Sequence, residues 1–205
     1  MAFTYFFRDK DVLDTIAEHA IPVLKTRQFI NIWDAGCAMG PEPYSLAIIL
    51  RENMGKFLFR NVKIHATDID EADFGTTIRM GEYPLEQLKR IPPEVREKYF
   101  RANGRPDTMI ISDEMKAAVS FRRHDLLTLQ PVRTNFGLIV CKNVLLHFKE
   151  EQRVEVIKMF HECLSDEGFL ALEQTQKLPP ELAGLFEPVV NNAQLFRKVR
   201  AADLN

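Results

Sequence analysis

The sequence predicts an α/β fold with a mostly parallel twisted sheet, helices on both faces, a C-terminal antiparallel hairpin and a small β-subdomain insert. Three observations support this prediction. Short apolar segments alternate with segments of helical periodicity. Several of the predicted strands end at an acidic residue or a glycine-containing turn. The last two strand-like segments are separated by Asn191 and Asn192, which is a hairpin signal.

Helical and strand periodicities assign the main elements. Apolar residues at helical spacing predict a first helix, which Pro22 is expected to kink or end. Pro41 suits the first turn of the second helix, and Gly168 is expected to cap the last one. The fourth strand is nearly all apolar, as buried parallel strands are. Helices are expected at residues 9–24, 41–52, 71–80 and 150–164, and strands at 29–33, 62–67, 119–124, 136–141 and 169–173.

Two parts of the chain depart from simple alternation. Residues 81–118 are long for one connection and contain four prolines, so they predict a helix followed by an insert with short strands. Residues 185–190 and 195–199 predict the antiparallel hairpin. We therefore expect one domain over 1–205, with 81–118 as an approximate inserted subdomain.

The composition narrows the classes of function. A chain of 205 residues with 46% hydrophobic content supports one sizeable core. The net charge of -2 gives no basic footprint, so nucleic acid is not an expected partner. No apolar run approaches a membrane span, and the N-terminus lacks a signal-peptide layout. Three widely spaced cysteines indicate reduced thiols in a cytoplasmic protein without a zinc site.

A glycine-containing turn follows the first strand at residues 34–40, and Glu42 lies just beyond it. Glycine lets the backbone turn sharply and approach a ligand closely. The third glycine of a dinucleotide fingerprint is missing, and Pro41 with Glu42 stands where a pyrophosphate would need free N–H groups. A carboxylate at this place suits the amino group of a ligand. The alternative is an ordinary tight turn between strand and helix.

Acidic residues end the next two strands. Asp68 is placed to accept both ribose hydroxyls of an adenosine, although a helix N-cap, which Asp70 could equally supply, is the alternative. Asp125, followed by Leu126, could meet an adenine amino group, or it could simply be solvated at a strand end.

Two further segments carry polar groups. After the fourth strand, Asn143 offers one hydrogen-bond acceptor and two donors, and His147 follows it, with a packing role as the alternative. The N-terminal Thr-Tyr-Phe-Phe-Arg segment ends at Arg8. It is either a tail packed on the domain or a flap whose arginine binds a carboxylate.

Taken together, these segments resemble the CheR-type chemotaxis receptor methyltransferases, which are protein-glutamate methyltransferases. The resemblance runs in order through residues 4–8, 35–45, 66–70 and 142–145, and the Glu-Pro-Tyr-Ser part of the second segment is quite specific. It implies a Rossmann-like fold dependent on S-adenosylmethionine and transfer of a methyl group to a glutamate side chain, giving the methyl ester. Residues 99–121 would be the small β-subdomain that the family inserts.

The resemblance also implies roles for the site residues. The methionine end of the cofactor would be held by Arg8 and Glu42, the ribose by Asp68, and the adenine region by Asp125 and Leu126. Arg8 and His147 are the catalytic candidates, because they would orient the acceptor. The cofactor-binding candidates are Arg8, Gly36, Cys37, Ala38, Glu42, Asp68, Asp125, Leu126, Asn143 and Val144.

The chain departs from the family pattern at several places. It begins at the Thr-x-Phe-Phe-Arg segment, without the N-terminal helical domain that helps to dock the receptor, so we expect poor or no receptor methylation. His147 stands where the family commonly has tyrosine, and residues 172–175 lack the usual Gly-His-Ser-Glu pattern. The insert carries only Gly104 where tail-gripping members have a richer glycine loop, so tethering by a receptor tail is not expected.

A carboxylate acceptor is ionised at neutral pH, so methyl transfer to it requires positioning and exclusion of water rather than a base. His147 would act as a general base only for a hydroxyl or amine acceptor. The alternatives are a methyltransferase for another protein or a small molecule, a non-catalytic S-adenosylmethionine-binding regulatory module and, least favoured, a nicotinamide dehydrogenase. The sequence leaves the acceptor and the oligomeric state open.

Overall fold

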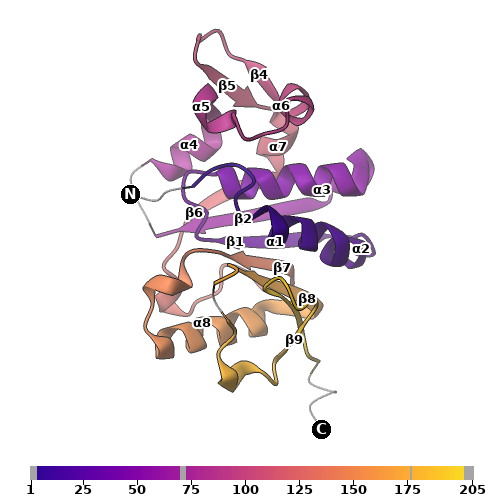
Figure 1. The fold of residues 1–205 in the computed structure, drawn as a ribbon, viewed down its shortest axis with the longest axis vertical. Coiled ribbons are helices and arrows are strands. Elements are labelled where there is room, and N and C mark those ends of the chain that lie inside the picture. Colours follow the sequence, from indigo (N-terminus) through magenta and orange to yellow (C-terminus); the bar gives the residue numbers. More distant parts are fainter. Residues whose placement is uncertain (1–3, 70–72, 176, 201–205) are drawn as a thin grey trace.

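The computed structural model describes residues 4–69, 73–175 and 177–200. Within them, seven strands form a main sheet in the order β6-β2-β1-β7-β8-β10-β9 (Figure 1). The first five of these strands pair in parallel, and β10 pairs antiparallel with both β8 and β9. This confirms the predicted mostly parallel sheet with a C-terminal antiparallel hairpin. The strands are β1 (Ile30–Ala35), β2 (Val62–Asp68), β6 (Val119–Arg123), β7 (Phe136–Cys141), β8 (Leu164–Leu172), β9 (Phe186–Pro188) and β10 (Leu195–Lys198).

Alternation along the strands separates two hydrophobic cores. Ile30 and Ile32 of β1 join a cluster with the N-terminal helices and α3, while Trp33 and Ala35 join a second cluster with α8. Successive side chains of a strand point to opposite faces, so these helices cover opposite faces of the sheet. The helices of the main fold are α1 (Lys10–Thr15), α2 (Ile21–Leu24), α3 (Pro41–Phe59), α4 (Phe74–Met80) and α8 (Glu150–Cys163). Among the described residues, no helix combines the length and the apolar character needed to cross a membrane.

A second, three-stranded sheet with the order β3-β5-β4 stands at one end of the molecule (Figure 1). The strands of this sheet lie within residues 82–111, whereas Val119–Arg123, part of which the resemblance assigned to the small subdomain, forms β6 of the main sheet. Buried Phe6 packs edge-to-face on Tyr83 at 5.0 Å and on Phe100 at 5.5 Å between ring centroids. The N-terminal segment is therefore anchored to this sheet. Its elements are β3 (Glu82–Pro84), α5 (Leu85–Leu88), α6 (Pro93–Tyr99), β4 (Phe100–Ala102), β5 (Thr108–Ile111) and α7 (Asp113–Ala118).

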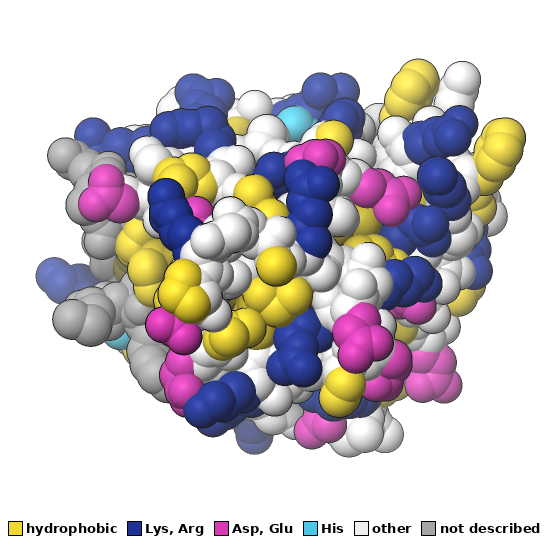
Figure 2. Space-filling model, turned by 90° about the horizontal axis from the view of Figure 1, so that it is seen from above, with side chains coloured by type: hydrophobic (Ala, Val, Ile, Leu, Met, Phe, Trp, Pro, Cys, Tyr) yellow, Lys and Arg dark blue, Asp and Glu magenta, His cyan; other side chains and the backbone are white. Residues whose placement is uncertain are grey.

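Figure 2 views the molecule from the end that carries the second sheet. On this face, acidic and basic side chains are interspersed with apolar ones. No single sign of charge dominates the face in this view.

Two predicted helix features are wrong, and the prediction that Pro22 kinks or ends the first helix is narrowed. The first helix does not end at Pro22 but continues to Leu24, and a π-helical turn at Ile16–Ala20 interrupts its regular α-helical geometry just before the proline. The second helix runs past residue 52 to Phe59, although Gly55 has non-helical angles of φ 76° and ψ 166°. Gly168 lies inside β8 instead of capping a helix. A Cβ atom there would lie 2.9 Å from the Ser165 carbonyl oxygen, so glycine permits a close backbone approach.

One predicted helix is described only in part. The prediction covered residues 71–80, and the structure describes α4 from Phe74 to Met80. Residues 71 and 72, together with the N-cap candidate Asp70, lie outside the described residues.

Candidate active site

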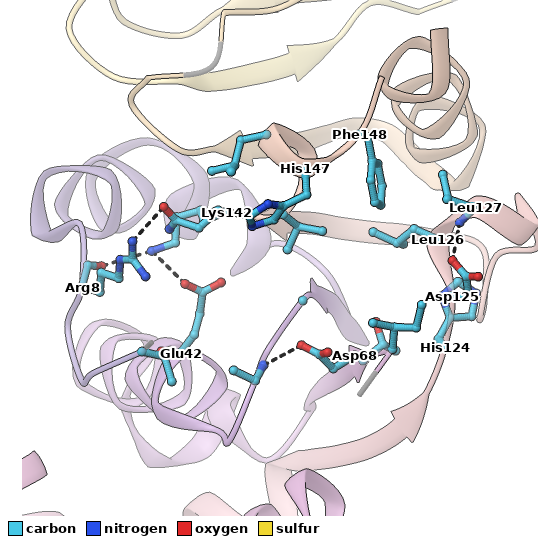
Figure 3. A pocket seen from close by; sticks show the side chains of 18 residues that line it. Arg8, Glu42, Asp68, His124, Asp125, Leu126, Leu127, Lys142, His147 and Phe148 are labelled. Carbon is cyan, nitrogen blue, oxygen red and sulfur yellow. Dashed lines mark hydrogen bonds and ion pairs between the residues drawn. The ribbon is translucent and has the colours of Figure 1, made fainter. Parts of the chain in front are cut away.

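The loops that follow β1, β2, β6 and β7 line a cavity of about 530 Å³, together with the N-terminal segment (Figure 3). The carboxyl ends of parallel strands meet at one edge of a sheet, which is where ligands of open α/β folds bind. Ten of the eleven predicted site residues line this cavity, and only Cys37 does not. The ten are Arg8, Gly36, Ala38, Glu42, Asp68, Asp125, Leu126, Asn143, Val144 and His147.

The turn after β1 depends on glycine. Gly36 has a φ of +102°, and a Cβ atom there would lie 2.0 Å from Cγ2 of Val144. The backbone N–H groups of Gly36 and Cys37 both donate to the Thr67 carbonyl oxygen, at 2.7 and 3.0 Å. The Cys37 side chain is buried behind the turn, and burial, followed by the charges of nearby carboxylates, raises the pKa of its thiol well above the usual value. Cys37 thus supports the turn from behind.

Asp68 connects the end of β2 to this turn. One of its carboxylate oxygens, Oδ2, accepts a hydrogen bond of 2.9 Å from the backbone N–H of Ala38. The side chain also lines the cavity, where Figure 3 shows it next to the turn. The carboxylate predicted to bind a ribose therefore also fixes the shape of the glycine-containing turn.

Lys142 is the most buried charged side chain of the site, with 1% of its side chain exposed. Its Nζ lies 2.9 Å from Oε2 of Glu42 and 3.4 Å from Oδ2 of Asp9, and it donates to the Arg8 carbonyl oxygen at 3.1 Å. Burial alone would lower the pKa of Lys142, but the neighbouring carboxylates outweigh burial and the pKa is raised. The prediction from sequence gave this lysine no role of its own. Its position after a buried strand, directly before Asn143, is the one signal that could have pointed to it.

Asn143 links the N-terminal segment to the sheet. Its Oδ1 accepts a hydrogen bond of 2.9 Å from Nη2 of Arg8, and its backbone N–H donates to Oε2 of Glu173 at 3.0 Å. Glu173 is buried, and burial raises the pKa of its carboxyl group. Arg8 lies between Phe7 and Asp9, which both have left-handed backbone angles, with φ 57° and 55°. The N-terminal segment is thus folded into the site, and Glu173 is a second residue that sequence reasoning missed.

The loop after β6 forms another wall of the cavity. Asp125 caps the short 3₁₀ helix at Leu126–Thr128, because its Oδ1 accepts the Leu127 N–H at 2.9 Å. Buried Leu126 offers an apolar surface to the cavity. His124 also lines it and lies 2.7 Å from the Gln130 carbonyl oxygen; since a carbonyl only accepts, Nε2 is the donor. Sequence reasoning did not single out this histidine.

His147 ends the short 3₁₀ helix at Leu145–His147, and its neighbours Leu146 and Phe148 also line the cavity. In Figure 3 it lies on the side formed by the loop after β7, with Glu42 and Asp68 on the other side. An imidazole therefore stands at the cavity, as the catalytic assignment requires.

These residues fit S-adenosylmethionine. The cavity volume lies within the range of small-molecule sites. The missing Cβ of Gly36 leaves room at the cavity wall, where a larger residue would strike Val144. Carboxylates at Glu42 and Asp68 match an ammonium group and a pair of ribose hydroxyls. Among the described residues, no group of three or more His, Cys, Asp or Glu side chains could hold a metal ion.

Comparisons with known proteins show which family the chain resembles in sequence. The family model described as "CheR methyltransferase, SAM binding domain" matches residues 2–194. A chemotaxis protein methyltransferase of Listeria innocua is 34% identical over 175 residues, covering 84% of this chain and 64% of that protein. One of Vibrio parahaemolyticus is 31% identical over 201 residues, covering 96% of this chain and 72% of that protein.

Among solved structures, the rRNA methyltransferase aviRa of Streptomyces viridochromogenes has a similar fold, with a TM-score of 0.59 and 14% identity. The match covers 98% of this chain and 88% of that one.

Proposed function

The chain belongs to the CheR methyltransferase family, and from this premise we propose that it transfers a methyl group from S-adenosylmethionine to a protein carboxylate, giving a methyl ester. The chain spans 64% of the length of its Listeria innocua relative, so activity, acceptor and partner are all part of the proposal. One observation supports it above the others: a glycine-containing turn, Glu42 and Asp68 meet in one cavity at the carboxyl edge of the sheet.

Each wall of the cavity receives one part of the cofactor in this proposal. Glu42 binds the ammonium group, helped by its place in the first turn of α3. Arg8 binds the carboxylate of the methionine end, and Asp68 the ribose hydroxyls. The adenine lies against Asp125 and Leu126, and Asn143 with Val144 completes the pocket.

When bound, S-adenosylmethionine would supply an electrophilic methyl group: the acceptor oxygen would bond to the methyl carbon as the carbon–sulfur bond breaks, and the positively charged sulfur would leave as a neutral thioether. The residues of the chain have the task of positioning, because a carboxylate acceptor is already ionised at neutral pH. Arg8 and His147 attract the acceptor carboxylate and hold one oxygen in line. Leu127, Leu146 and Phe148 line the cavity with apolar surface that excludes water during the transfer.

A chemotaxis receptor is the first acceptor to test, since the relatives are named chemotaxis protein methyltransferases. Cytoplasmic location is also part of the proposal, supported by three unpaired cysteine thiols. The presence of His147 at the cavity favours a second candidate, transfer to a hydroxyl or amine with the imidazole as general base.

Two measurements test the proposal. Calorimetry should detect binding of S-adenosylmethionine and of its demethylated product, but not of NAD. If neither S-adenosylmethionine nor its product binds, the proposed function is refuted. A radiolabelled methyl assay then uses a receptor cytoplasmic fragment and, separately, a cell lysate. Label released by mild base indicates a methyl ester, and label that resists base favours the hydroxyl or amine acceptor.

A further inference from the structure

The side-chain carboxyl group of Asp34 is fully buried, and among the described residues no donor forms a hydrogen bond to it. It lies near the end of β1 and is 0% exposed. Neither of its side-chain oxygens has a hydrogen-bond partner within the part of the chain that the structure describes. The residues beside it on the neighbouring strands, Ala66 on β2 and Val140 on β7, offer it no side-chain donor. An ionised carboxylate left this way carries a large desolvation cost.

Glu42 is the acidic neighbour of Asp34: after burial, the charge of Glu42 and a side-chain hydrogen bond to it are the next causes that raise the pKa of Asp34. Oε1 of Glu42 is also buried and without a partner among the described residues, while Oε2 lies 2.9 Å from Nζ of Lys142. Two ionised carboxylates only accept hydrogen bonds, so they would repel each other across this contact. One shared proton converts the repulsion into a hydrogen bond and satisfies a buried oxygen of each group.

We propose that Asp34 is a protonated carboxylic acid that donates its hydrogen bond to Glu42 and is the positioning residue for the ammonium-binding carboxylate. The inference deepens the proposed function and rests on it for the role of Glu42, but the protonation of Asp34 does not depend on it.

The surroundings decide which of the two acids keeps the proton. The Lys142 ammonium group beside Glu42 and the positive first turn of α3 both favour a negative charge at Glu42 rather than at Asp34. Among the described residues, no ion pair joins Asp34 to a cation. Burial first, and then Glu42, raise the pKa of Asp34 well above its usual range, with Lys142 opposing and Asp68 adding to the rise. The thiols of Cys37 and Cys141 also face this cluster, and burial raises the pKa of both.

A neutral Asp34 fixes the Glu42 side chain from one oxygen while Lys142 fixes it from the other. A carboxylate has about four lone-pair positions, so Glu42 can still accept a bond from a ligand on its cavity side. The hydrogen bond, and not the charge of Asp34, is what matters in this arrangement. Asparagine, which donates through its amide, should therefore replace aspartic acid, whereas alanine should not.

The first test follows the aspartate carboxyl groups by carbon-13 NMR on protein labelled at aspartate, across a pH titration without cofactor. One aspartate should stay protonated at neutral pH in the wild type. The carbon-13 signal of this protonated aspartate should be absent from Asp34→Asn. It should remain in the control variant Asp14→Asn, because Asp14 is an exposed aspartate paired with Lys10. A wild type in which every aspartate is ionised at neutral pH would overturn the proposal.

The second test measures affinity for the demethylated cofactor product by calorimetry. Asp34→Asn should bind within about threefold of the wild type, and Asp34→Ala about tenfold or more weakly, a ratio that corresponds to about 1.4 kcal/mol. Equal affinity of wild type and Asp34→Ala, or a tenfold loss in Asp34→Asn, would contradict the positioning role. If Asp34→Ala does not fold, Asp34→Asn and the titration decide. If the wild type binds no cofactor product, the proposed function fails while the titration still reports on Asp34.

Discussion

Replacing Gly36 with alanine tests whether the turn after β1 needs glycine, both for its backbone angles and for its close packing against Val144. The new methyl group meets two separate penalties in the structure. The backbone is held at a φ of +102°, which costs a non-glycine residue about 1–3 kcal/mol. The Cβ atom would also lie 2.0 Å from Cγ2 of Val144, so the valine must move, and overpacking of this kind costs about 1–3 kcal/mol.

A matched control separates the two penalties. Gly104 also has a left-handed backbone, with a φ of +82°, but a Cβ atom there would have no heavy atom within 4 Å. Gly104→Ala therefore carries the backbone penalty alone. For a chain of this size about 1 kcal/mol shifts the melting temperature by about 2–4 °C, so Gly36→Ala should melt about 2–12 °C below Gly104→Ala.

The assay is thermal unfolding of both variants, extended to a double-mutant cycle with Val144→Ala. Shortening Val144 removes the clash, so the cycle should show a favourable coupling of about 0.5–3 kcal/mol between the two substitutions. Equal melting temperatures of Gly36→Ala and Gly104→Ala, or a coupling of zero, would refute the described packing of the turn against the loop after β7.

Four further predictions concern the charged groups. Lys142→Met leaves buried carboxylates unpaired and should lower the free energy of unfolding, measured with urea, by about 3–5 kcal/mol. The exposed control Lys10→Met should lower it by about 0–1 kcal/mol, and similar losses in the two variants would contradict the burial of Lys142. Asp68→Ala removes hydrogen bonds of about 1.5–3 kcal/mol each and should weaken binding of the demethylated product about 100-fold, and unchanged affinity would rule out the ribose assignment. Because the pKa of Asp34 is raised in the folded state, the unfolded chain loses this proton first, so the contribution of Asp34 to stability falls as pH rises above about 4, the usual aspartate value. Asp34→Asn should therefore gain melting temperature over the wild type increasingly with pH, and a constant gain would argue against a buried proton. His147→Tyr should change the methyl-transfer rate while leaving the affinity for the demethylated product unchanged, and an unchanged transfer rate would make His147 a packing residue.

Features set by local sequence were predicted well. The apolar run at Phe136–Cys141 was predicted residue for residue as β7, because a strand buried on both faces needs a continuous apolar segment. The prediction for β2 differed by one residue, because its buried Val62, Ile64 and Ala66 alternate with more polar residues, as a strand pattern requires. The errors came where neighbouring elements decide the outcome. Gly168 after a helix is a common cap signal, but the backbone of β7 beside it requires a residue without a side chain inside β8.

The candidate site was predicted where chemistry follows a strand end directly, as at Asp68 and Asn143. Lys142 was missed because a lysine at a strand end is ordinarily exposed to water, and its position directly before Asn143 does not by itself indicate burial. Its burial depends on Glu42 and Asp9, which are far away in the sequence and are brought together only by the fold. The same holds for Glu173, whose partner is a backbone N–H of another loop.

The position of Lys142 connects two parts of the site that the proposed function treats separately. The same ammonium group holds the Glu42 carboxylate and, through the Arg8 carbonyl oxygen and the Asp9 carboxylate, the N-terminal segment. Any movement of Glu42 on ligand binding therefore alters one of the contacts that hold the Lys142 ammonium group beside this segment. Arg8 is carried by that segment and hydrogen-bonds Asn143 at the cavity wall. The carboxylate proposed to bind the cofactor's ammonium group and the arginine proposed to bind its carboxylate are thus joined through one buried lysine, so we expect binding at one to order the other.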